Sequence, residues 1–135
     1  MSNKLDISDL MERARFKEFG RGPYEFDCYG WAIEINRRLG NRIPDYGSIP
    51  CSNVTGIEGA IQDKVQRHEA IEVTKPVPGD MVWLRWVDGY CHLGVVIDHE
   101  YFSTITEKAG PVQISLCDPI WKRLIIGIYR CKTLS

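Results

Sequence analysis

The stretch Phe26–Trp31, FDCYGW, places a cysteine between an aspartate and an amphipathic segment that runs to Leu39. Aspartate is a preferred helix N-cap residue, because its carboxylate accepts hydrogen bonds from the free N–H groups of the first turn. The apolar residues that follow recur at helical spacing, on the same face as the cysteine. The sequence therefore predicts a helix that begins after Asp27 and carries Cys28 in its first turn.

Cys28 lies where a thiol is expected to become reactive. The unpaired N–H groups and the positive end of the helix dipole favour an anion in the first turn. The thiolate is the nucleophilic form of cysteine, and helix N-termini and protonated imidazoles promote it. The carboxylate of Asp27 opposes a second negative charge, so we expect it to point at the backbone amides instead. A free cysteine is most often a packing residue, and Cys28 alone does not establish a nucleophile.

A second block supplies an imidazole. The turn signal Pro78–Asp80 precedes a strand-like run, Met81–Trp86, and Asp88–Gly89 marks a tight hairpin turn before the next run, Cys91–Ile97. His92 lies at the start of that last run. A histidine on a strand is more often structural than catalytic, but together with the upstream cysteine helix it indicates a thiol nucleophile and its imidazole base.

These two blocks resemble the NlpC family of cell-wall cysteine peptidases, which have a compact papain-like fold. The resemblance is carried by FDCYG at 26–30, PGD at 78–80 and HLGV at 92–95, and it covers nearly the whole chain. Flanking segments are most similar to the variant encoded in tailed-phage tail modules. These segments are Gly20–Gly22, Leu39–Gly40, Pro44–Tyr46, Trp121–Arg123 and Gly127–Arg130.

The resemblance implies an activity and its residues. The expected reaction is hydrolysis of an amide in the peptidoglycan stem peptide, commonly the bond between γ-linked D-glutamate and diaminopimelate. Cys28 would be the nucleophile and His92 the general base and acid, with no metal or cofactor. The implied partners are the stem peptide and, for the tail variant, phage tail proteins.

The chain departs from the family at the residue that orients the imidazole. Relatives usually carry a polar residue, often a second histidine, on the strand after the histidine strand, and histidine, asparagine or glutamine is expected there. Counting along the chain, that place falls at Thr104, or at Ser103 if the turn is one residue shorter. A hydroxyl can accept from the imidazole N–H, but it orients the ring less strongly than a carboxylate or amide. The nearby His99 is expected to be exposed at a turn.

Composition is that of a small globular protein, and we expect one domain over residues 1–135. A net charge of −1 gives no electrostatic reason to expect nucleic acid as a partner. The apolar run Leu124–Tyr129 is too short to span a membrane. Residues 1–6 lack the apolar stretch of a signal peptide, so we expect the protein to stay in the cytoplasm when made or to leave it with a virion.

Five cysteines leave an odd one and show no C-x-x-C spacing, which argues against a zinc site and against a disulfide framework. We expect reduced thiols, four of them packing residues. Those four are Cys51, Cys91, Cys117 and Cys131.

The rest of the pattern predicts an α+β fold. A first helix is expected over Ile7–Phe16, capped by Asp6 or Ser8, and a third helix is expected to open at a capping box, Thr55–Glu58, and to end at Gln66. Helices followed by a run of strands indicate N-terminal helices packed on an antiparallel sheet of about five to six strands. The predicted strands are Ile71–Val73, Met81–Trp86, Cys91–Ile97, Tyr101–Thr106, Val112–Leu116 and Ile125–Cys131.

Two other functions fit the same residues. An amidase or acyltransferase on this scaffold would use Cys28 and His92 with another acyl donor. A catalytically weak or inactive tail-assembly or wall-binding component would explain the missing orienting residue.

Overall fold

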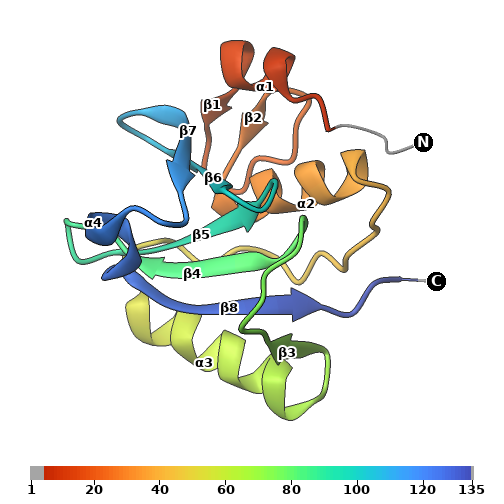
Figure 1. Ribbon diagram of the computed structural model, residues 1–135, viewed down its shortest axis with the longest axis vertical. Coiled ribbons are helices and arrows are strands. Elements are labelled where there is room, and N and C mark those ends of the chain that lie inside the picture. Colours follow the sequence, from red (N-terminus) through yellow and green to blue (C-terminus); the bar gives the residue numbers. More distant parts are fainter. Residues whose placement is uncertain (1–4, 135) are drawn as a thin grey trace.

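The computed structural model describes residues 5–134, and within them the chain forms four helices and eight strands (Figure 1). The helices are α1 (Ser8–Arg13), α2 (Cys28–Arg38), α3 (Val54–Gln66) and α4 (Pro119–Lys122). The strands are β1 (Arg15–Phe16), β2 (Glu25–Phe26), β3 (Ala70–Glu72), β4 (Met81–Arg85), β5 (Cys91–Val96), β6 (Tyr101–Thr106), β7 (Gly110–Ser115) and β8 (Ile125–Cys131). None of these helices is long and apolar enough to cross a membrane.

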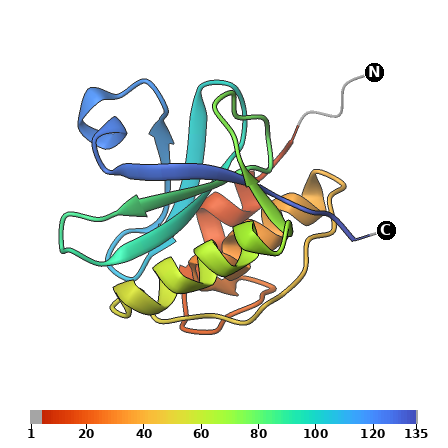
Figure 2. The ribbon, with the colours of Figure 1, turned by 90° about the horizontal axis from the view of Figure 1, so that it is seen from below.

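Six strands form one antiparallel sheet in the order β3-β8-β4-β5-β6-β7. Successive side chains of a strand point to opposite faces, and β4 uses both. Met81 belongs to the hydrophobic cluster that includes Trp31 of α2, and Trp83 belongs to the hydrophobic cluster that includes Ile57 of α3. Val82 and Leu84 pack into a separate cluster with Trp121 of α4. Helices α2 and α3 therefore lie on the same face (Figure 2), which confirms the predicted α+β class.

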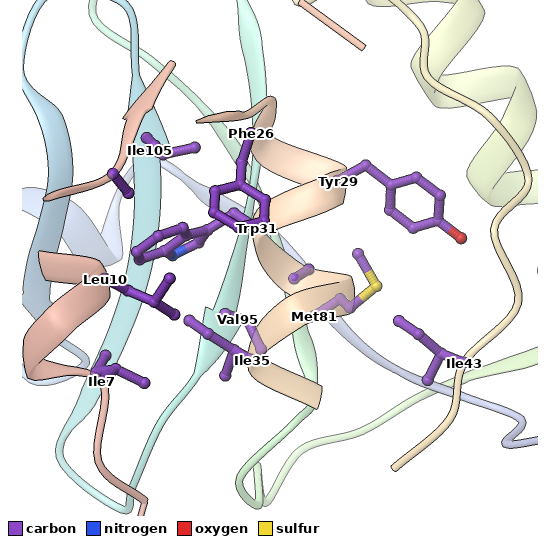
Figure 3. Close-up of a cluster of buried hydrophobic side chains, with 12 residues drawn as sticks. Ile7, Leu10, Phe26, Tyr29, Trp31, Ile35, Ile43, Met81, Val95 and Ile105 are labelled. Carbon is purple, nitrogen blue, oxygen red and sulfur yellow. The ribbon is translucent and has the colours of Figure 1, made fainter. Parts of the chain in front are cut away.

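The core between α2 and the sheet is built around Trp31 (Figure 3), which is fully buried. Its ring meets Phe26 edge-on, with 5.7 Å between centroids. Buried indoles need a partner for their N–H, and Trp31 Nε1 donates to Ser103 Oγ of β6 over 3.1 Å. This hydrogen bond links the cysteine helix directly to the sheet.

The turn before β4 is held from two sides. Gly79 has a φ of 98°, a conformation that glycine adopts without steric cost. The buried Asp80 carboxylate accepts from the Val77 N–H over 2.8 Å and from two nitrogens of Arg130 over 2.8 and 2.9 Å. Asn36 of α2 donates to the Gly79 carbonyl over 3.1 Å. The Pro-Gly-Asp signal thus fixes where β4 enters the sheet relative to α2.

Helix α2 begins as predicted, with Asp27 as its N-cap. Asp27 Oδ1 accepts from the Gly30 N–H over 2.7 Å, and Oδ2 accepts from the Phe19 N–H over 3.1 Å. Position 30 must be glycine, because a Cβ there would collide with the carbonyl oxygen of Gly20. The carboxylate therefore points at amides, as expected.

The first helix is shorter than predicted. It ends at Arg13 because Ala14 is extended, and the segment Arg15–Phe16 forms β1, which pairs in parallel with β2. The predicted cap is also wrong. Ile7 occupies the N-cap position without a side-chain hydrogen bond, and Asp6 accepts from the Ser8 N–H outside it.

The third helix begins earlier than predicted. Asn53 caps it by accepting from the Gly56 N–H over 3.0 Å, so the expected capping box at Thr55 lies inside the helix. Helix α4 was not predicted, although Asp118 caps it and proline opens it. Strands β6 and β8 have the predicted bounds, and the other predicted strands differ by one or two residues at their ends.

Replacing Asp27 by alanine should lower the free energy of unfolding by about 2 kcal/mol or more, because a cap is lost and the Phe19 N–H loses its acceptor. The matched control is Asp118→Ala, which removes an exposed cap from α4 and should cost about 0.5–1 kcal/mol. Urea unfolding followed by circular dichroism measures both. Equal losses for the two variants would contradict the central role of Asp27.

Candidate active site

Cys28 is the first residue of α2, and its thiol lies at the wall of a cleft of about 630 Å³. His92 comes to the same wall from β5. A second wall is the loop of residues 44–53 between α2 and α3, called here the Cys51 loop. The structure thus brings together the two residues that the sequence predicted as nucleophile and base.

A second thiol lies between them. Cys51 Sγ is 4.0 Å from Cys28 Sγ and 3.7 Å from His92 Nδ1. One ligand atom of each of the three residues lies within 4.8 Å of the others. We refer to Cys28, Cys51 and His92 as the thiol–imidazole cluster.

The prediction that Cys51 is a packing residue is therefore wrong, and so is that for Cys117, which is exposed. Cys91 is buried against Ile57, as a packing residue should be. The position of Cys51 depends on long-range contacts, including the Cys91 N–H, which donates to the Cys51 carbonyl over 3.0 Å. No local spacing in the sequence signals such a contact.

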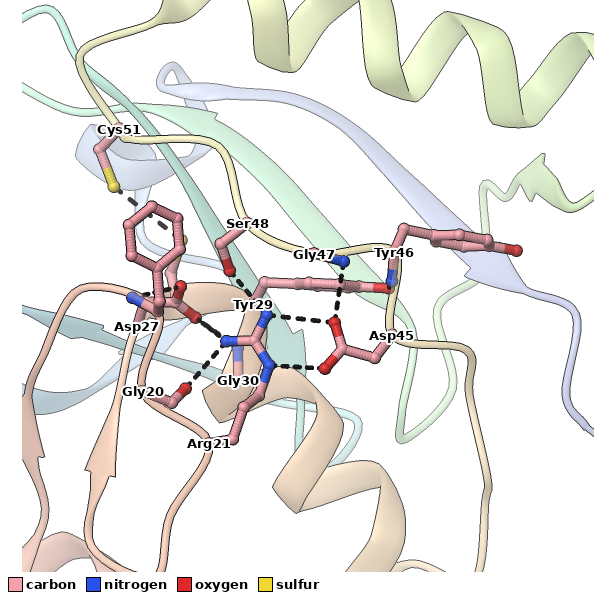
Figure 4. A network of polar contacts seen from close by, with 12 residues as sticks. Gly20, Arg21, Asp27, Tyr29, Gly30, Asp45, Tyr46, Gly47, Ser48 and Cys51 are labelled. Atoms are coloured by element: carbon pink, nitrogen blue, oxygen red, sulfur yellow. Dashed lines mark hydrogen bonds and ion pairs between the residues drawn. The ribbon is translucent and has the colours of Figure 1, made fainter.

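Arg21 connects the start of α2 to the Cys51 loop (Figure 4). Its Nη1 donates to Asp27 Oδ1 over 2.9 Å, its Nε to Asp45 Oδ2 over 2.8 Å, and its Nη2 to Ser48 Oγ over 2.8 Å. A guanidinium presents several donors in a rigid plane, so one side chain can hold three acceptors in fixed relation. The loop that carries Cys51 is thereby held beside the nucleophile helix.

The cluster favours a thiolate at Cys28. A hydrogen bond from Cys51 lowers the pKa of the Cys28 thiol, with help from the Leu93 N–H, while burial and the charge of Asp27 oppose it. The pKa of Cys51 is raised, first by its hydrogen bond to Cys28 and then by burial. Cys51 therefore stays protonated and donates, and Cys28 is the sulfur that ionises.

His92 is buried beside aromatic rings. Its imidazole and the Trp86 ring have centroids 5.1 Å apart. Burial lowers the pKa of His92, and the charge of Asp88 partly offsets this. The ring is therefore neutral at neutral pH and available to take up a proton.

The hydroxyls predicted to orient His92 have other partners. Thr104 Oγ1 donates to the Leu93 carbonyl and Ser103 Oγ to the Val112 carbonyl, both over 2.7 Å. Neither of these hydrogen bonds involves His92, and an orienting role for Thr104 or Ser103 stays a prediction.

Thr106, which sequence reasoning missed, lines the cleft with His92. The pairing of Val95 with Ser103, continued along both strands, matches His92 with Thr106, two residues beyond the counted position. The side chain of His99 is 88% exposed, as expected.

Cys28 should be alkylated fastest of the cysteines at neutral pH, with a midpoint below the ordinary thiol pKa of 9.0. Cys51→Ala should move this midpoint to higher pH, because the hydrogen bond that lowers the pKa is lost. Cys51→Ser keeps a donor and should shift it less. Peptide mass spectrometry after timed iodoacetamide treatment across a pH series measures each rate, with the exposed Cys117 as internal reference. Identical profiles for wild type and Cys51→Ala would contradict this role of Cys51.

No protein-family model and no curated protein sequence matches the chain. Solved structures do. A protein of the NLP/P60 family, similar to lipoprotein, from Staphylococcus aureus aligns with 95% of this chain and 40% of its own, at 18% identity and a TM-score of 0.56. NlpC2 from Trichomonas vaginalis aligns with 93% of this chain and 45% of its own, at 17% identity and a TM-score of 0.54.

NlpC1 from Trichomonas vaginalis aligns with 94% of this chain and 43% of its own, at 14% identity and a TM-score of 0.56. The chain therefore spans less than half the length of each of these structures. The likeness confirms the fold that the resemblance implied: the chain has the fold of the NlpC and NLP/P60 proteins.

Proposed function

We propose that the protein is a cysteine peptidase that hydrolyses an amide bond of a peptidoglycan stem peptide. The observation that carries this proposal is the thiol–imidazole cluster, in which the thiol of the first residue of a capped helix lies beside an imidazole. The cluster faces a cleft, and the fold is that of the NlpC and NLP/P60 proteins.

In the proposed reaction the Cys28 thiolate attacks the amide carbonyl carbon, and a carbon–sulfur bond forms. The free N–H groups of the first turn of α2, including that of Cys28, stabilise the oxyanion. His92 takes up the proton of the Cys28 thiol as the thiolate forms, and gives that proton to the leaving amine as the carbon–nitrogen bond breaks. His92 then takes a proton from water, whose oxygen attacks the thioester and releases the thiolate.

The charged side chains of the cleft support a substrate that carries both positive and negative groups. Its wall includes the carboxylates of Glu18, Glu69 and Asp88 and the ammonium groups of Lys64 and Lys108. A stem peptide offers ammonium and carboxylate groups on the same short chain. The bond between γ-D-glutamate and diaminopimelate is the proposed target, on the resemblance of the sequence motifs.

The resemblance to the phage tail-module variant also suggests where the protein acts. We propose that the protein acts with phage tail proteins and reaches the cell wall in the virion after synthesis in the cytoplasm. The support is the similarity of the flanking segments, such as Pro44–Tyr46. That segment includes Asp45, which Arg21 binds.

Incubation with L-Ala-γ-D-Glu-diaminopimelate should release diaminopimelate, detected by mass spectrometry. Cys28→Ala should lower the rate about 10³-fold or more, because the nucleophile is lost. His92→Ala should lower it about 10²–10⁴-fold, the range for a positioned acid or base. Cys117→Ala is the matched cysteine control and should leave the rate unchanged.

Failure of folded, reduced wild type to cleave this peptide would reject this bond as the substrate. An added amine acceptor distinguishes a hydrolase from the acyltransferase alternative, since a transferase would form a new amide with the amine, whereas a hydrolase would release the free acid. Binding of the peptide without either product would favour the non-enzymatic alternative.

A further inference from the structure

The thiol–imidazole cluster has the geometry of a metal site. In tetrahedral zinc sites the metal lies about 2.3 Å from sulfur and about 2.0 Å from nitrogen. Those lengths place two sulfur ligands about 3.8 Å apart and a sulfur and a nitrogen about 3.5 Å apart. The corresponding distances here are 4.0 Å between the two sulfurs and 3.7 Å from Cys51 Sγ to His92 Nδ1, and all three ligand atoms lie within 4.8 Å of one another.

The three donors are held by separate elements that are already tied together. Cys28 is fixed by the capped start of α2 and His92 by the pairing of β5 with β4. Cys51 is held next to β5 by the hydrogen bond from the Cys91 N–H to its carbonyl. A metal ion would therefore find its ligands in place and would need only small side-chain adjustments.

We propose that Cys28, Cys51 and His92 form a zinc-binding site of two thiolates and one imidazole. Two sulfurs and one imidazole nitrogen are donors that zinc prefers. All three residues line the cleft, so water or a substrate carboxylate could supply the fourth ligand. On binding, Cys51 loses its proton to solvent, Cys28 binds as thiolate and His92 binds as neutral imidazole.

Zinc bound in this site would prevent catalysis by Cys28 and His92. This part of the inference rests on the proposed peptidase function. The lone pair with which Cys28 attacks an amide would be shared with the metal, and the imidazole nitrogen would be blocked. Zinc would therefore act as a reversible inhibitor, and a chelator would restore activity. The sequence expectation of no zinc site relied on the absence of C-x-x-C spacing, whereas these ligands come from three distant parts of the chain.

Spectroscopy with cobalt tests the site without any peptidase assay. Co²⁺ added without oxygen to reduced, chelator-treated protein should give a sulfur-to-cobalt charge-transfer band and the visible bands of tetrahedral cobalt, at one ion per chain, and Zn²⁺ should abolish them. Cys51→Ser should weaken Zn²⁺ binding more than about 100-fold, because loss of a ligand should cost more than the 10–100-fold that follows mutation of residues that only contact the ligands. Cys117→Ser, the matched control, should bind like wild type.

Alkylation of the wild type provides a readout that needs no variant to fold. Zn²⁺ should protect Cys28 and Cys51 from iodoacetamide and leave Cys117 reactive. Absence of one-to-one binding at micromolar Zn²⁺, equal affinity in wild type and a folded Cys51→Ser, or protection of neither cluster cysteine would each overturn the proposal.

The peptidase assay separates the two proposals. Zinc binding by a protein that, after removal of the metal, does not cleave the stem peptide would leave the metal site standing and reject this bond as the substrate. Cleavage that Zn²⁺ does not inhibit, with no cobalt spectrum, would support the peptidase and reject the metal site. Cleavage inhibited by Zn²⁺ and restored by a chelator, with weaker inhibition in Cys51→Ser, would support both.

Discussion

The carboxylate of Asp27 holds three parts of the chain together at the start of α2. It caps the helix through the Gly30 N–H, accepts from the Phe19 N–H of the preceding turn, and pairs with Arg21. Arg21 in turn holds the loop that carries Cys51. One buried carboxylate therefore sets both where the helix begins and where the second thiol lies. The charge of this carboxylate opposes a thiolate at Cys28, as burial does.

The second thiol distinguishes this cleft from a simple cysteine–histidine pair. As a thiol, Cys51 donates to Cys28 and lowers its pKa. As a thiolate, it would become the third ligand of a soft metal ion. Both roles follow from the same short distances between Cys51 and the other two side chains. Under the two proposals, a protonated Cys51 assists attack on a carbonyl, and a deprotonated Cys51 binds the metal.

The sequence predicted what local chemistry determines. The Asp27 cap, the turn at Gly79 and the bounds of β6 and β8 depend on neighbouring residues, and the structure has them as predicted. The site was predicted only where its residues carry local signals, as Cys28 and His92 do. Cys51 was missed because a loop residue is placed by distant contacts.

The first helix was predicted too long because apolar residues continue past Arg13, while pairing of β1 with β2 takes the chain out of the helix. Pairing between strands lies outside what helical periodicity can indicate. Which hydroxyl of β6 lies opposite His92 depends on how β5 and β6 are aligned, and counting along the chain does not determine that alignment. Continuing the pairing of Val95 with Ser103 along both strands matches His92 with Thr106.

The most direct test of the account is to trap the acyl-enzyme. Stem peptide mixed with His92→Ala or wild-type protein and quenched in acid at short times is digested and analysed by mass spectrometry. The account predicts a thioester between the γ-carboxyl of D-glutamate and Cys28, with none on Cys51 or Cys117. Product formation without an adduct, or an adduct on Cys51, would contradict the assignment of Cys28 as the nucleophile.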